Sequence, residues 1–144
     1  MAIRYFALIY GLVFLVVGIA GFIPGLLSPL GAGDPEVTID GSTGRLFGLF
    51  PVNSLHSIVH IVFGIWGLAA YRGYSASLTY ARAVAVIYAI LFVIGLIPGL
   101  HTLFGLVPLY GHDVWLHLLL AVVAAYFGFV APGRPVETTS ASRV

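Results

Sequence analysis

The chain has 144 residues, of which 60% are hydrophobic and 8% are charged, and its formal net charge is +1. Soluble domains carry about 25% charged residues, so this composition indicates a membrane protein that crosses the bilayer several times. No basic patch is present to neutralise phosphates, which excludes nucleic acid as a partner, and the lack of cysteine excludes disulfides, thiolate metal ligands and iron–sulfur clusters.

Four segments are long and apolar enough to span the hydrocarbon layer, which takes about 20 mostly apolar residues. They run from about residue 5 to 27, 53 to 71, 79 to 100 and 113 to 131. Asn53 is a suitable N-cap for the second segment, and the carboxylate of Asp113 suits the start of the fourth. Residues 1–131 are therefore predicted to form one all-α transmembrane four-helix bundle, and residues 132–144 a disordered, polar cytoplasmic tail.

The charged residues predict how the bundle is oriented. Five arginines fall on the side that holds both chain ends: Arg4, Arg72, Arg82, Arg134 and Arg143. The other side carries four acidic residues and one arginine: Asp34, Glu36, Asp40, Asp113 and Arg45. By the positive-inside rule, both termini of this multi-pass cell-membrane protein are cytoplasmic, and every histidine lies toward the extracytoplasmic face.

An internal repeat relates the two halves of the chain. The segment Leu46–His60 returns as Leu103–His117, with identical Leu, Phe, Gly, Leu, Pro and final His at matched positions. The shorter run Ile23–Leu27 returns as Ile97–His101. This pattern predicts two repeated helical hairpins related by a pseudo-two-fold axis along the membrane normal, which is a parallel repeat.

Histidine spacing predicts a site between the second and fourth helices. His56 and His60 are four residues apart and share one helix face, and Asp113 and His117 have the same spacing at the matched positions. If both faces turn toward the axis, three imidazoles and one carboxylate converge. Such a ligand set suits a divalent transition metal, zinc or iron.

Other interpretations of the same residues remain open. His60 and His117 alone could be the axial ligands of a haem b in an electron carrier. A hydrogen bond between His56 and Asp113 that ties the hairpins together would need no cofactor. The chain would then be a structural subunit that packs against other membrane subunits or its own copies. The sequence has no Ser-His-Asp set, P-loop or dinucleotide fingerprint, so no enzymatic activity is predicted.

The remaining polar and small residues carry weaker expectations. His101 and His112 have leucine at the matched positions and are predicted to be solvated loop histidines. Arg45 can pair with an acidic residue of its own loop, with Asp113, or with a haem propionate. Tyr88 is predicted to pack inside the bundle. Small residues match across the repeat, and such residues let helices approach closely in lipid; they are Gly64 with Ala121, and Gly67 with Ala124.

Two longer stretches resemble the signatures of a known family. The first is Gly48–His60 followed by Gly64–Leu68, and the second is Asp113–His117 leading to Ala125–Gly128. They are similar to an uncharacterised bacterial membrane family described as a four-helix domain of unknown function. The resemblance covers about Tyr5 to Val130. It implies a bacterial origin and four transmembrane helices, and it supplies no activity and no catalytic residue.

Overall fold

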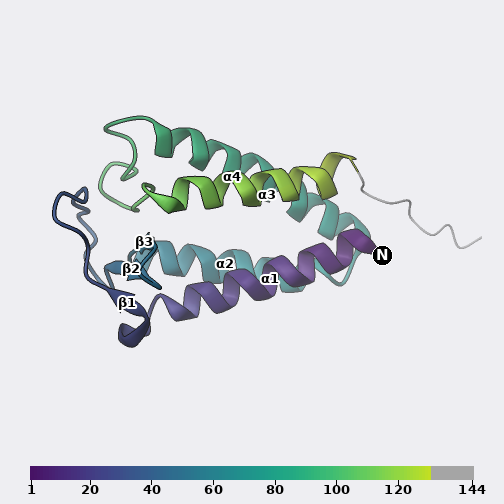
Figure 1. Cartoon of the computed structure of the whole chain (residues 1–144). Coiled ribbons are helices and arrows are strands. Elements are labelled where there is room, and N and C mark those ends of the chain that lie inside the picture. Colours follow the sequence, from purple (N-terminus) through teal and green to yellow (C-terminus); the bar gives the residue numbers. More distant parts are fainter. Residues whose placement is uncertain (131–144) are drawn as a thin grey trace, which may run out of the picture.

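The computed structural model describes residues 1–130; the predicted tail over 132–144 lies outside the described residues. Four α-helices make up most of the described chain: α1 (Ala2–Ala20), α2 (Ser54–Ala70), α3 (Tyr74–Leu96) and α4 (His112–Ala125). A π-helical segment, η2 (Tyr126–Val130), continues α4. Helices α1 and α2 form one antiparallel hairpin and α3 and α4 form the other, and the two hairpins lie side by side (Figure 1).

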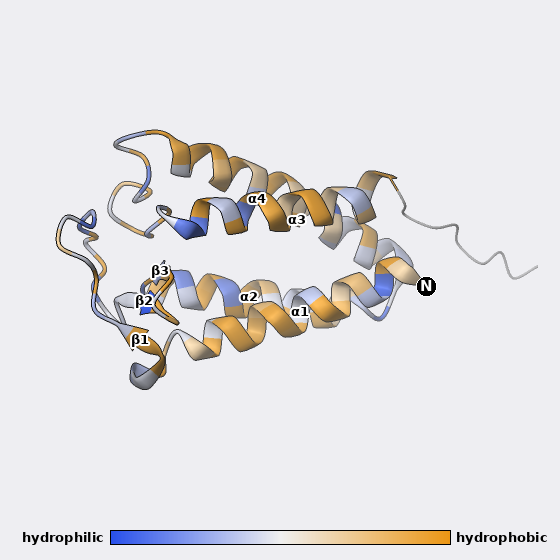
Figure 2. Ribbon diagram, viewed as in Figure 1, coloured by the Kyte–Doolittle hydropathy of each residue, from blue (hydrophilic) through white to orange (hydrophobic). Residues whose placement is uncertain are grey.

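Three helical segments have the length and apolarity needed to cross a membrane: Ala2–Ala20, Tyr74–Leu96 and His112–Val130. Helix α2 is also apolar but has only 17 residues. Most positions along the helices are hydrophobic, and hydrophilic positions on α2 and α4 gather toward the end near the strands (Figure 2). The structure therefore supports the membrane class that the composition predicts.

A small sheet, which the all-α prediction missed, joins α1 to α2. Helix α1 ends at Ala20, whereas the predicted segment runs to residue 27 with Pro24 as the position expected to bend or end it, and a short 3-10 segment, η1 (Pro24–Leu26), follows. Proline lacks an amide hydrogen and disfavours helical geometry at the residue before it, which explains the early end.

The chain then forms β1 (Leu27–Ser28), β2 (Gly44–Leu46) and β3 (Phe50–Val52), paired antiparallel in the order β1-β2-β3. The fold class is corrected accordingly to four helices with a three-stranded sheet. Strands of two or three residues are too short for an alternating pattern to show in sequence.

Helix α3 also differs from its predicted bounds of 79–100. It begins at Tyr74, where the Ser77 hydroxyl donates to the carbonyls of Ala70 and Gly73, each at 2.9 Å. It ends at Leu96 because Ile97, which precedes a proline, has an extended backbone. Hydropathy alone places a helix end where apolar residues run out, whereas the structure places it where the backbone geometry changes.

Glycines let α1 and α2 pack backbone against backbone. A Cβ added at Gly67 would lie 2.7 Å from the Cα of Gly11, and one at Gly64 would lie 2.7 Å from a backbone nitrogen of α1. The structure thus confirms the predicted close packing at Gly64 and Gly67. Their repeat partners Ala121 and Ala124 are buried in the main apolar core.

Two matched positions of the predicted repeat have similar backbone conformations. Phe47 and Gly48 have positive φ angles of 54° and 74°, and the matched Phe104 and Gly105 have φ angles of 59° and 85°. The two connections differ elsewhere, because strands occur in the α1–α2 connection but not in the described α3–α4 connection, residues 97–111. The pseudo-two-fold relation between whole hairpins stays a prediction.

Candidate metal centre

The first turn of α2 is fixed by Asn53, which is fully buried. Its side-chain oxygen accepts a hydrogen bond of 2.9 Å from the backbone N–H of His56, which is an N-cap interaction. Its side-chain nitrogen donates to the carbonyls of Ile39 at 2.9 Å and Leu106 at 2.8 Å. Asn53 therefore joins both connections to the turn that carries His56, and His60 follows one turn later on the same face.

The matching pair on α4 lies in the first two turns of that helix. Asp113 and His117 are both buried, with 2% and 1% of their surfaces exposed. The Asp113 Oδ2 atom lies 3.5 Å from His117 Nε2. The i, i+4 spacing read from the sequence thus places both side chains on the inner face of α4, as on α2.

Three of the four predicted ligands meet between the hairpins. One ligand atom each from His56, Asp113 and His117 lies within 4.8 Å of the other two, and all three residues are buried. The ring centroids of His56 and His117 are 6.1 Å apart. This cluster, called here the His/Asp cluster, has a composition that can hold a metal ion.

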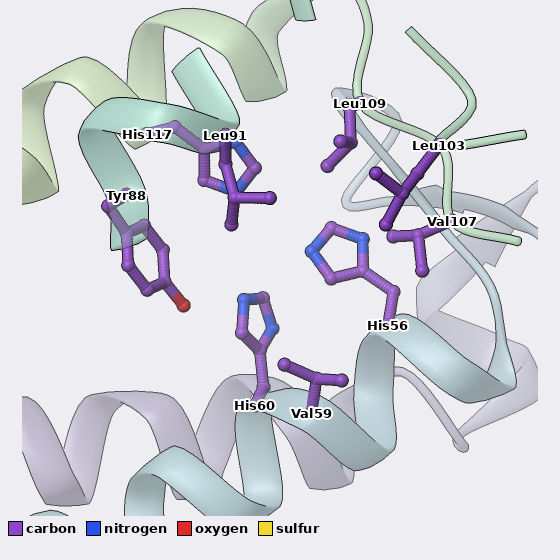
Figure 3. A pocket seen from close by; sticks show the side chains of 9 residues that line it. All are labelled: His56, Val59, His60, Tyr88, Leu91, Leu103, Val107, Leu109 and His117. Carbon is purple, nitrogen blue, oxygen red and sulfur yellow. The ribbon is translucent and has the colours of Figure 1, made fainter. Parts of the chain in front are cut away.

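His60 lies beside the His/Asp cluster rather than in it. Its ring centroid is 4.6 Å from that of His56, and the ring stacks on Phe14 with a centroid distance of 5.6 Å. The rings of His56, His60 and His117 all turn toward one space (Figure 3). His60 therefore neighbours the cluster, at a position from which it can contact anything bound there.

That space is a cavity of about 80 Å³. Besides the three histidines, α3 contributes Tyr88 and Leu91, and the α3–α4 connection contributes Leu103, Val107 and Leu109. The Tyr88 ring packs edge-on against His117 at 5.1 Å, and its hydroxyl points toward His60 (Figure 3). The sequence predicted the burial of Tyr88 but not its place at the site. Leu103, Val107 and Leu109 lie in the repeated segment Leu103–His117, but the repeat alone did not indicate that they cover the histidines.

Several polar atoms of the site are buried without a hydrogen-bond partner in residues 1–130. They are Oδ2 of Asp113 and the Nδ1 atoms of His56, His60 and His117. Buried polar atoms in proteins are nearly always paired, and each exception calls for an explanation such as an ion. No hydrogen bond joins His56 to Asp113 within the described chain. The alternative in which such a bond ties the two hairpins together without a cofactor therefore has no support in the geometry.

The spacing of Asp113 and His117 also fits a shared cation. Their separation of 3.5 Å exceeds an ordinary N–H···O hydrogen bond, which spans about 2.7–3.2 Å. Two ligands on one tetrahedral zinc ion, with bonds of about 2.0–2.1 Å, stand about 3.4 Å apart. The pair is therefore spaced as two metal ligands would be.

The other polar residues lie outside the cluster. Arg45 pairs with Asp34 of its own loop through contacts of 2.6 and 3.1 Å, which is one of the predicted pairings. The Arg45 guanidinium lowers the pKa of the Asp34 carboxyl. His101 is half-buried and His112 is exposed, and neither belongs to the cluster. Arg45 is thus engaged away from Asp113.

Comparison with curated proteins and with solved structures found no match. A family model described as "Domain of unknown function (DUF4383)" matches residues 4–130. The matched region contains the sheet, the His/Asp cluster and all four helices except the first two residues of α1, and it agrees with the resemblance seen in the sequence. The chain belongs to the DUF4383 family, whose domain is of unknown function.

Proposed function

We propose that this membrane protein binds one divalent transition metal, zinc or iron, through His56, Asp113 and His117, with His60 as a further ligand or contact. The observation that carries the proposal is the convergence of three buried ligand residues, from two different hairpins, with one ligand atom of each within 4.8 Å of the others. Buried ionisable groups in a membrane span are costly, so such a convergence is a functional site by default.

The ligand types suit these two metals. Two imidazoles and one carboxylate are found in zinc sites that keep an open coordination position and in non-haem iron(II) sites. A buried carboxylate such as Asp113 is costly without a counter-charge, and a metal ion would supply one. The protein would then sense, carry or protect against the metal.

The proposed site lies near the extracytoplasmic face. His60 is six residues into α2, about 9 Å along the helix at 1.5 Å per residue. Arg4 and Arg72 fall at the opposite end of the helices, where α1 begins and α2 ends, and Arg82 lies in the first half of α3, which begins at that end. The positive-inside rule supports placing that end, and both termini, in the cytoplasm.

The cavity volume favours an ion over haem b. Pockets for drug-sized ligands enclose about 300–1,000 Å³. The space between His56, His60 and His117 is about 80 Å³, far too small for a porphyrin without a large rearrangement. A purely structural subunit, in turn, leaves the unpaired atoms of Asp113 and His117 unexplained.

Metal analysis tests the proposal. Detergent-purified protein should carry close to one equivalent of zinc or iron by inductively coupled plasma mass spectrometry, and the visible spectrum should show no Soret band. His117→Ala should lose the metal. His112→Ala is the matched control, because His112 lies in the same helix but is exposed and outside the cluster. Wild-type protein that stays metal-free after supplementation with both metals would contradict the proposal, and a Soret band would replace it with haem.

A further inference from the structure

A second cavity reaches His60 and His117 from the side of the bundle. It encloses about 220 Å³ between α1 and α4. Apart from the two histidines, its lining is entirely apolar and includes Val13, Phe14 and Leu120. The candidate metal centre is therefore bordered on this flank by hydrocarbon rather than by polar side chains.

This cavity opens toward the lipid. Val13, at its edge, is 47% exposed on a helix that is long and apolar enough to span the membrane. Toward the end of the bundle that holds the sheet, the centre is instead covered by Val107 and Leu109, which are both buried. A ligand that enters beside Val13 would come from the bilayer and not from water.

The apolar space continues along α1 beyond the second cavity. A third cavity of about 330 Å³, lined by Phe6, Ile9 and Phe127 among others, also lies between α1 and the last helical segments. Tyr10, which lines the third cavity, donates a hydrogen bond of 3.3 Å to the carbonyl of Leu120, which lines the second. We call the two cavities together the α1–α4 seam. It extends along α1 from Val17 to Ala2, about 22 Å at 1.5 Å per residue.

We propose that the α1–α4 seam binds a long-chain carboxylate, a fatty acid taken from the membrane, with its carboxylate on the metal. This inference rests on the proposed metal centre. With His60 as a contact rather than a ligand, the three protein ligands leave an open position on the ion. A divalent ion with neutral histidines and one Asp113 carboxylate keeps one positive charge in an apolar site, and an anionic head group cancels it.

His60 is placed to orient the head group. Its ring lines both the cavity of the His/Asp cluster and the second cavity, and its Nδ1 has no partner in the described chain. A carboxylate with one oxygen on the ion can accept a hydrogen bond from His60 on the other oxygen. The tail then fills the α1–α4 seam, where burial of its methylene groups adds affinity.

Binding of oleate by the full-length, detergent-purified protein tests the inference. The metal content is measured first, and the protein is then loaded with Co²⁺, whose visible absorption reports ligands on the ion. Oleate should change this absorption and bind at least about tenfold more tightly than acetate, which lacks the tail, or oleyl alcohol, which lacks the charge.

Two tryptophan variants on α1 locate the tail. Val13→Trp fills the second cavity and should weaken oleate binding at least about tenfold while the Co²⁺ content stays unchanged. Val16→Trp is the matched control, since Val16 is 64% exposed on the same helix and does not line the seam. It should bind oleate as the wild type does.

The outcomes separate the two proposals. Protein that retains neither zinc, iron nor Co²⁺ overturns the metal centre and, with it, the carboxylate ligand. Metal-loaded protein that binds oleate no better than acetate, or equally well after Val13→Trp, overturns only the fatty-acid inference. Equal binding of oleate by metal-free protein also overturns that inference, because the head group would not then be on the ion.

Discussion

Asn53 links the helix that carries His56 to both connections of the bundle. Its side chain caps α2 and donates to Ile39 and Leu106, so it makes three hydrogen bonds while fully buried. Sequence analysis identified it as a cap because Asn is a preferred N-cap residue. The two other bonds could not be predicted, since they join carbonyls that are distant in sequence and whose directions depend on loop geometry.

Replacement of Asn53 by Ala should therefore destabilise the protein by more than the loss of a cap. A lost N-cap costs about 1 kcal/mol, and each of the two other hydrogen bonds, which are partly buried, contributes about 0.5–1.5 kcal/mol, so we expect about 2–4 kcal/mol in total. Thermal unfolding followed by circular dichroism in detergent measures this loss. Asn53→Ser keeps a capping oxygen, and its stability should lie between those of the wild type and Asn53→Ala. An Asn53→Ala protein as stable as the wild type would show that the two carbonyls find other partners.

The close approach of α1 and α2 makes a second, independent prediction. At Gly67 an added methyl group would lie 2.7 Å from the Cα of Gly11 and 2.8 Å from the carbonyl oxygen of Ala7, both on backbone that cannot move aside without separating the helices. Gly67→Ala should cost about 1–3 kcal/mol, as overpacking typically does. Gly25→Ala is the matched control, because a methyl group there has no atom within 4 Å. Equal unfolding temperatures for the two variants would contradict the backbone packing.

The helices were predictable because hydropathy alone defines a membrane span, whereas their ends and the sheet were not. Pro24 and Ile97 set ends through local backbone geometry that a hydropathy window averages out. The strands are held by pairing between Ser28 and Arg45 and between Arg45 and Pro51, which are contacts across a loop. Spacing of four residues predicted which side chains share a face, but not which of them would come within ligand distance.

Across the whole molecule, the candidate site lies where the two hairpins meet. His56 belongs to the first hairpin and Asp113 and His117 to the second, so a bound ion would link the two. The repeat in sequence predicted this pairing of faces through its constant spacing. It could not predict that His60, at the position matching His117, would lie beside the cluster while His56 lies within it, because that depends on how the hairpins are rotated.

A metal that bridges the hairpins should stabilise the folded bundle as a whole. An ion that binds only the folded state at one hundred times its dissociation constant adds about 2.7 kcal/mol, which raises the unfolding temperature by several degrees. We expect this rise in the unfolding temperature when Zn²⁺ is added to chelator-treated wild-type protein, and its reversal when the chelator is added again.

His117→Ala should show no rise, because one hairpin then keeps only the Asp113 carboxylate as a ligand. His112→Ala should respond as the wild type does. A similar rise in His117→Ala would mean that the stabilising ion binds elsewhere, and that the convergence of these helices serves packing alone.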